Sequence, residues 1–163
     1  MNRPQYQYRV TKYDPELRAT SSVYPPDDWT SRSDIGKPFR GGILTEERYL
    51  STEQAYLRAA SAFLAEAKIL QLKIVGLENR GEKLHAPSKN STVKSEDIPI
   101  LLRSLLREEF WCKLECPSSF IHVGYDYYMY IGVPHACTDA SILAQRLGLF
   151  VETFQSPFAE NDA

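Results

Sequence analysis

A histidine, an aspartate and four tyrosines lie close together in residues 122–132, whose sequence is HVGYDYYMYIG. Ser118 or Ser119, combined with His122 and Asp126, supplies the residue types of a Ser–His–Asp nucleophilic site, which is recognised by geometry and not by chain order. This combination points to a small hydrolase or a nucleotide-modifying enzyme with a site near His122 and Asp126. The alternative is a structural histidine, because apolar residues flank His122 on both sides, as in a strand. No HExxH or GxSxG motif occurs, and we assign no catalytic residue.

Three cysteines and a second histidine offer a different chemistry, a zinc site built from Cys112, Cys116, His135 and Cys137. Residues four apart in a strand are separated by about 13 Å, at roughly 3.3 Å per residue. Tetrahedral zinc holds its ligands at about 2.0–2.3 Å. Because residues 112–116 are expected to form a strand, this spacing disfavours the site. We therefore expect no metal and no cofactor.

The composition is that of a soluble globular protein. The chain has 163 residues, 43% of them hydrophobic and 25% charged, so one domain spanning residues 1–163 can bury a core without disulfides. No apolar run is long enough for a transmembrane helix, and residues 1–10 lack the apolar core of a signal peptide. Three cysteines, an odd number, fit a reducing compartment. We therefore expect a cytoplasmic protein with no membrane partner.

Charge is unevenly distributed along the chain. The formal net charge is -2, which gives no case for a nucleic acid as partner. From residue 120 onward five acidic residues oppose one arginine, a net of -4, so the first 119 residues carry +2. An acidic C-terminal third attracts basic protein surfaces. The alternative is that these charges form an ordinary solvent-exposed face with no role in binding.

Hydrophobic periodicity predicts a single, largely antiparallel α+β domain with about five to six strands and about three helices. The expected strands are residues 5–13, 70–78, 112–116, 120–124, 127–133 and 148–154, and the expected helices begin at residues 51, 95 and 138. A capping box, STEQ at residues 51–54, marks the start of the first helix. Prolines, glycines and short polar residues predict a long irregular loop at about 14–48 and a polar loop at about 79–94.

Alternation divides the tyrosines of the predicted hairpin between two faces. Tyr127 is expected on the core face, together with Met129, Ile131 and Val133. Tyr128 and Tyr130 would then face outward, near Tyr125 and Asp126 at the turn. Exposed tyrosines beside a carboxylate are typical of protein-binding surfaces. The alternative is that they form cross-strand aromatic pairs covered by the helices.

A second candidate contact surface is the polar loop DDWTSRSD, residues 27–34. Trp29 is either an exposed contact residue or an anchor in the core, and Asp34 adds a charge. The candidate partner-binding residues are Trp29, Asp34, Tyr125, Asp126, Tyr128 and Tyr130.

Several runs together resemble a family of small bacterial proteins, the immunity proteins of polymorphic or contact-dependent toxin systems. The runs are YRVTKYDP, WTSRSDIGKPF, LTEERYLSTEQAYL, LREEFWCKLE, HVGYDYYMYIG and GLFVETFQSPF. The resemblance implies a cognate toxin domain as partner, neutralised by stoichiometric binding and not by catalysis. The acidic C-terminal third suits a basic toxin, such as a nuclease. The sequence does not choose between occlusion of the toxin's active site and binding beside it, and it does not indicate an oligomeric state. A regulatory protein-interaction module without a toxin partner is a further alternative.

Overall fold

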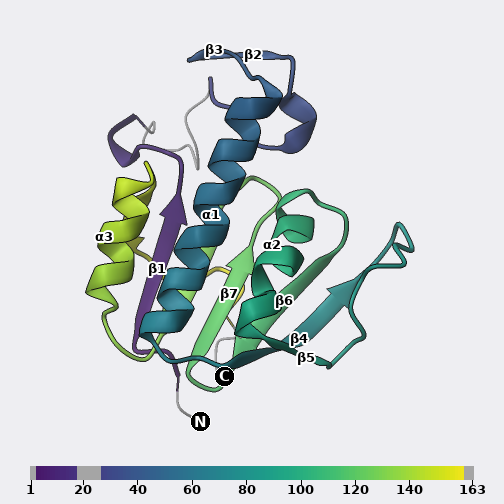
Figure 1. The fold of residues 1–163 in the computed structure, drawn as a ribbon, viewed down its shortest axis with the longest axis vertical. Coiled ribbons are helices and arrows are strands. Elements are labelled where there is room, and N and C mark those ends of the chain that lie inside the picture. The colour runs from purple at the N-terminus through teal and green to yellow at the C-terminus, as the bar shows by residue number, and fades with distance from the viewer. Residues whose placement is uncertain (1–2, 18–26, 160–163) are drawn as a thin grey trace.

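Seven strands form one antiparallel sheet, and three helices cover one of its faces (Figure 1). The computed structural model describes residues 3–17 and 27–159. The strands of the sheet are β1 (Tyr6–Thr11), β4 (Gln71–Glu78), β5 (Thr92–Lys94), β6 (Trp111–Cys116), β7 (Ser119–Val123), β8 (Met129–Val133) and β9 (Phe150–Thr153). The helices are α1 (Glu46–Glu66), α2 (Ile98–Leu106) and α3 (Thr138–Arg146). The predicted α+β class is confirmed, with one strand more than expected in the main sheet.

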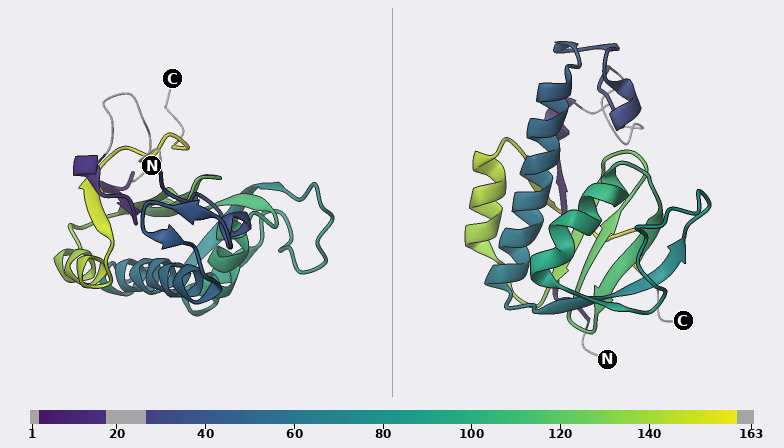
Figure 2. Two further views of the ribbon diagram at one scale, coloured as in Figure 1. Left: turned by 90° about the horizontal axis from the view of Figure 1, so that it is seen from above. Right: turned by 45° about the vertical axis from the view of Figure 1, so that its right-hand side comes forward.

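The strands follow the order β5-β4-β6-β7-β8-β1-β9, so β1 lies between β8 and β9 from the other end of the chain. Viewed from above, the helices make one layer and the sheet the other (Figure 2). One row of paired residues on the helix-covered face consists of Ile74, Leu114, Ile121, Ile131 and Tyr8. The four aliphatic residues of this row are fully buried, so their alternation with the opposite face fixes the register of the sheet.

Helix α1 begins earlier than the sequence motif suggests. Thr45 is its N-cap, and the Thr45 side chain accepts a hydrogen bond from the N–H of Arg48. The predicted capping box at residues 51–54 lies inside the helix, so that prediction is wrong. The buried face of α1 includes Tyr49, Tyr56 and Phe63, because residues three and four apart share a helix face.

The two predicted loops contain more regular structure than expected. The loop predicted at about 14–48 includes short 3-10 helices at Pro15–Leu17 and Arg32–Asp34 and a hairpin of β2 (Pro38–Phe39) and β3 (Gly42–Ile43). Its residues 18–26 lie outside the described part of the chain. The loop predicted at about 79–94 ends in β5, which pairs with β4 at the edge of the sheet. Strand β5 has only three residues, and two of them are polar, so hydrophobic periodicity does not predict it.

None of the helices in the described ranges combines the length and the apolar character that crossing a bilayer requires.

Candidate functional site

The β7–β8 hairpin carries residues 125–127 in its turn and not in a strand. The side chain of Asp126 accepts a hydrogen bond from the N–H of Tyr128, as Asp often does in turns. Tyr127 has φ of +66°, a left-handed conformation that L residues rarely adopt. The predicted alternation over residues 127–133 therefore starts only at Met129. As a result, Tyr127 and Tyr128 are both buried, on opposite faces of the sheet.

Tyr127 points toward the helices and fills an aromatic cluster. Its ring centroid lies 4.8 Å from that of Tyr56, 5.0 Å from that of Trp29 and 5.9 Å from that of Tyr49. The three contacts are edge-on, the arrangement that aromatic quadrupoles favour. Trp29 is only 4% exposed, so it is a core anchor in this structure and not an exposed contact residue.

A line of polar groups leads from this cluster to the helix surface. The Tyr127 hydroxyl donates to the Tyr49 hydroxyl at 3.0 Å, which in turn donates to Glu53 Oε2 at 2.8 Å. Arg107 binds both oxygens of Glu53, and Arg103 Nε lies 3.4 Å from Oε1. Burial raises the pKa of Tyr49, so its hydroxyl keeps its proton. The network holds the C-terminal end of α2 against α1.

Tyr128 and Tyr130 lie on the opposite, helix-free face, and they are covered. They are 0% and 5% exposed. Tyr128 stacks on Tyr13 with centroids 5.0 Å apart, and the Arg9 guanidinium lies 5.2 Å from the Tyr128 ring centroid. The ring of Phe154 lies 5.9 Å from that of Tyr130. The expectation that these two tyrosines face outward is therefore wrong, because Tyr13 from the segment after β1 covers Tyr128, and Phe154 from the segment after β9 covers Tyr130.

His122 lies on the same helix-free face and joins the sheet to the segment after β9. Its Nδ1 is 2.8 Å from Ser156 Oγ, and its Nε2 is 2.8 Å from Glu115 Oε1. Its ring stacks on Phe120 at 4.1 Å. Burial lowers the pKa of His122, against the opposing effect of Glu115. A neutral ring that donates from Nε2 to Glu115 and accepts at Nδ1 from Ser156 satisfies all three groups.

The Ser–His–Asp combination considered from the sequence is not assembled. Both ring nitrogens of His122 are engaged by Ser156 and Glu115, and Ser119 Oγ donates to a backbone carbonyl. A serine, a histidine and a carboxylate do meet at His122, but two of the three residues differ from those proposed. Ser156 lies 34 residues from His122 in sequence, so no local pattern signals the contact.

The cysteines considered as zinc ligands also stay apart. Cys112 and Cys116 both lie on strand β6, the arrangement in which their spacing precludes a shared tetrahedral metal. Within residues 3–17 and 27–159, no group of three or more His, Cys, Asp or Glu side chains is placed to hold a metal ion.

Tyr125 is the exposed member of the tyrosine run, at 59%. It borders a surface hollow, here called the Tyr125 hollow, whose lining includes Glu78, Arg80, Glu108 and Trp111. Glu78 and Glu108 raise the pKa of Tyr125 in addition to the effect of burial, and Arg80 opposes them. The hollow lies where the β7–β8 turn meets the segment after α2, because its lining combines Tyr125 from the turn with Glu108 from that segment.

Of the residues that line this hollow, only Tyr125 was a candidate from the sequence, and Glu108 is one of those that were missed. It follows the C-cap of α2 and has φ of +59°, at a position where helices often place glycine. Burial, with Asp126 and Asp34 nearby, raises the pKa of Glu108. The sequence signal for it is the adjacent pair of glutamates at positions 108 and 109.

Asp34 ties down the 27–34 loop near the same end of the molecule. Its side chain accepts hydrogen bonds from the N–H groups of Thr30 and Ser31. Burial alone would raise its pKa, but these bonds and Lys37 outweigh burial and lower it. Asp34 and Asp126 both lie close enough to Glu108 to raise its pKa. The other candidate residues do not join them: Trp29 is buried in the core, and Tyr128 and Tyr130 lie on the opposite face of the sheet.

Fold and site together define an α+β domain with a tyrosine-bearing hollow, lined by charges of both signs, at one end of its sheet. Comparison of the chain with protein families, with curated proteins and with solved structures finds no match to any of them.

Proposed function

We propose that this chain is a cytoplasmic immunity protein that binds and neutralises a bacterial toxin domain by stoichiometric protein–protein interaction. The observation that carries the proposal is Tyr125, a large and exposed aromatic side chain in a hollow lined by charged residues of both signs. Tyrosine buries much contact area at low conformational cost and is enriched among the residues that dominate binding energy. The resemblance of several sequence runs to immunity proteins supports the same reading.

A rigid base supports this surface. The turn that carries Tyr125 is anchored by the Asp126 side chain and by the Tyr13 hydroxyl, which donates to the Asp126 carbonyl at 2.6 Å. Beneath it, Tyr56 donates to the Tyr127 carbonyl at 2.8 Å. Binding then costs little ordering of the free protein, which favours tight association.

Glu108 is the carboxylate of the Tyr125 hollow best placed to meet a basic partner residue, because Glu78 lies 4.0 Å from Arg80 and Glu109 contacts His85. Burial raises the pKa of Glu108, and repulsion by the negative charges of Asp126 and Asp34 adds to this effect. An arginine or lysine from a toxin would relieve this repulsion and could lie against the Tyr125 or Trp111 ring.

If the gene immediately upstream encodes a toxin domain, co-expression with that domain tests the proposal. We expect the chain to restore growth and to co-purify with the toxin as a stoichiometric complex. Failure of both would contradict the proposal. Rescue by a catalytic amount of the chain, far below the amount of toxin, would point to an enzyme.

A hydrolase is the second candidate, because His122 contacts both Ser156 and Glu115. Against it, Ser156 is 5% exposed and its hydroxyl also accepts the N–H of Phe158 at 3.2 Å, which suits a structural clasp. Labelling with a fluorophosphonate probe separates the two candidates. A hydrolase requires labelling of wild type that the variant Ser156→Ala lacks, whereas a clasp predicts none in either.

A further inference from the structure

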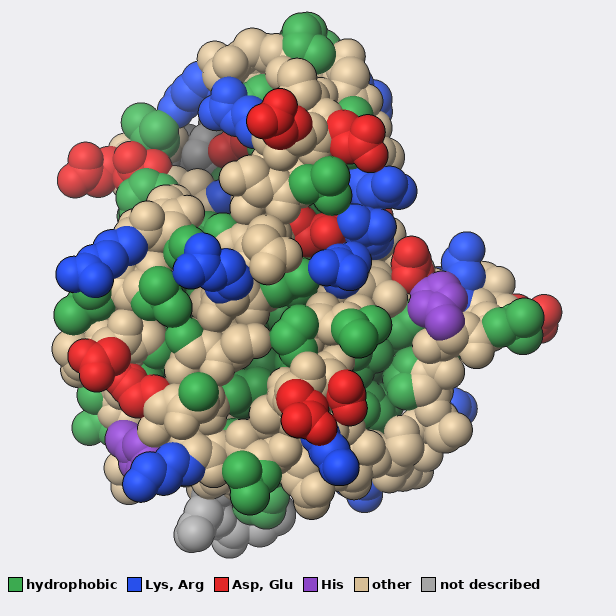
Figure 3. Space-filling view, viewed as in Figure 1, with side chains coloured by type: hydrophobic (Ala, Val, Ile, Leu, Met, Phe, Trp, Pro, Cys, Tyr) green, Lys and Arg blue, Asp and Glu red, His purple; other side chains and the backbone are tan. Residues whose placement is uncertain are grey.

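The helix layer carries a groove that the proposed function does not use, here called the helix groove. Its floor is the outward side of α1 at Leu57, Ser61 and Ala62, and its walls are Pro99 of α2 and Leu143 of α3. The space is about 450 Å³. Ser61 and Ala62 of α1 have small side chains, which leaves space between α2 and α3 at this part of the helix layer. Figure 3 shows hydrophobic side chains in the middle of this face.

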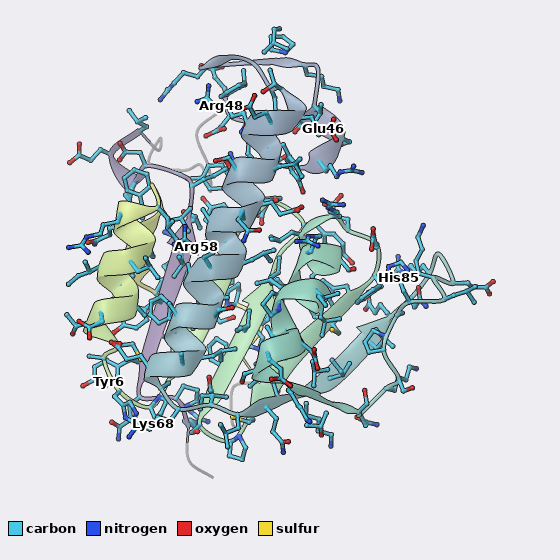
Figure 4. All side chains as sticks on the ribbon, viewed as in Figure 1. Tyr6, Glu46, Arg48, Arg58, Lys68 and His85 are labelled. Carbon is cyan, nitrogen blue, oxygen red and sulfur yellow. The ribbon has the colours of Figure 1, made fainter. Side chains whose placement is uncertain are left out.

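The charged residues that line the groove are both arginines, Arg58 of α1 and Arg103 of α2. Arg58 is exposed and has no ion pair in the part of the chain that the structure describes; it projects beside α3 in Figure 4. Arg103 is 44% exposed and shares Glu53 with Arg107. Two arginines, Arg103 and Arg107, thus share a single buried carboxylate, and Arg58 adds a further positive charge on α1, which leaves this side of the groove positive.

We infer that the helix groove binds an amphipathic helix of a partner protein whose apolar stripe is flanked by carboxylates. Small side chains on the floor let a fourth helix approach α1 closely, at the distance of about 8–10 Å usual for packed helices. The half-buried Ala62, Pro99 and Leu143 provide the apolar contact, and Arg58 and Arg103 select acidic flanks. A helix laid in an apolar groove is a recurrent mode of recognition. This surface is separate from the Tyr125 hollow, with which it shares no lining residue.

A synthetic helical peptide tests the inference without knowledge of the natural partner. The probe has a leucine stripe flanked by glutamates and a fluorescein label, and is about 18 residues long, because shorter helices are marginal in water. A matched probe carries lysines in place of the glutamates. In anisotropy titrations we expect saturable binding of the glutamate probe only, weakened about tenfold or more by Arg58→Glu. Lys68→Glu, which changes an exposed charge beyond the end of the same helix, should leave binding unchanged.

A second variant addresses the apolar part of the groove. Ala62→Trp fills the floor and should abolish binding of the glutamate probe, and circular dichroism checks that the variant is folded. Equal binding of both probes, no saturable binding, or equal effects of Arg58→Glu and Lys68→Glu would overturn the inference. If sedimentation shows that wild type dimerises and that Ala62→Trp abolishes the dimer, the groove takes a second copy and the inference is wrong. None of these results depends on the toxin, so the proposed function is tested separately.

Discussion

Arg107 grips Glu53 with two parallel hydrogen bonds, from Nε to Oε2 and from Nη2 to Oε1, each 2.8 Å long. The Glu53 side chain is 3% exposed and the Arg107 side chain 22%. Glu53 also accepts the Tyr49 hydroxyl, so one carboxylate from the middle of α1 connects the aromatic cluster to the end of α2. The segment that carries Glu108 follows directly after this contact.

Removing the Glu53 carboxylate should therefore destabilise the protein strongly. Glu53→Ala leaves Arg107 and Tyr49 without their acceptor, and breaking a buried pair in this way costs about 3 kcal/mol. Gln54→Ala changes the next residue, which is exposed, and should cost less than about 0.5 kcal/mol. Urea unfolding of the three proteins at neutral pH measures both effects. A Glu53→Ala protein as stable as Gln54→Ala would show that the network contributes little.

Glu108→Gly should make the protein more stable. Glycine adopts the left-handed conformation of this position without the steric cost that glutamate carries, and the expected gain is about 0.5–1 kcal/mol in the free energy of unfolding. Glu109 is not in that conformation, so Glu109→Gly should lower the free energy of unfolding. Toxin binding should weaken in Glu108→Gly despite its higher stability. A destabilised Glu108→Gly would contradict the backbone assignment.

The pH dependence of stability should carry a contribution from His122. Because burial lowers its folded pKa, the unfolded chain takes up a proton as pH falls below about 6.5 while the folded protein does not. The contribution of His122 to the free energy of unfolding is therefore complete above about pH 6.5. It is lost as the pH falls from there toward the pKa of His122 in the folded protein. Glu115 and, through it, Lys113 are the charged groups that face the ring.

Unfolding in urea at about pH 7.5 and about pH 5.5 measures this contribution. Wild type should lose stability between the two values, and His122→Gln should lose less. The exposed His135 provides the control, since His135→Gln should behave as wild type. An equal loss in wild type and His122→Gln would assign the dependence to other groups.

Gly132 is required by a close contact across the sheet. Gly132 pairs with Phe120 in the β7–β8 register, and a Cβ at residue 132 would lie 2.5–2.8 Å from three atoms of the Phe120 ring. Gly132→Ala should cost about 1–3 kcal/mol through overpacking. In a Phe120→Leu background the same change should cost less, because the ring is gone. Equal costs in the two backgrounds would show that Phe120 is not the reason for the glycine.

Periodicity identified most of the fold. Residues 70–78, 112–116 and 120–124 were predicted as strands and correspond to β4, β6 and β7 within one or two residues. The start of α1 was missed because two capping signals compete, and tertiary contacts of Tyr49 extend the helix back to Thr45. Local patterns cannot decide between such signals, since packing of the first turn determines which one is used.

The candidate site was harder to predict because its contacts are long-range. Tyr128 and Tyr130 alternate like outward-facing residues, yet Tyr13 and Phe154 from distant parts of the chain cover them. Tyr127 was assigned to the core face, and it is buried there, but by a left-handed turn and not by alternation. Asp126 and Tyr125 were correctly placed in a turn. Glu108 joins them only through the packing of α2.

The most direct test of the proposed function is the affinity of the cognate toxin domain for single-residue variants, measured by isothermal titration calorimetry. Tyr125→Ala should weaken binding by about 30-fold or more, as expected for a dominant contact residue. Tyr6→Ala removes another exposed tyrosine, 42% exposed at the opposite end of the molecule (Figure 4), and should leave the dissociation constant within about twofold of wild type. Toxin bound equally well by Tyr125→Ala and wild type would contradict the assignment of the Tyr125 hollow as the toxin-binding surface.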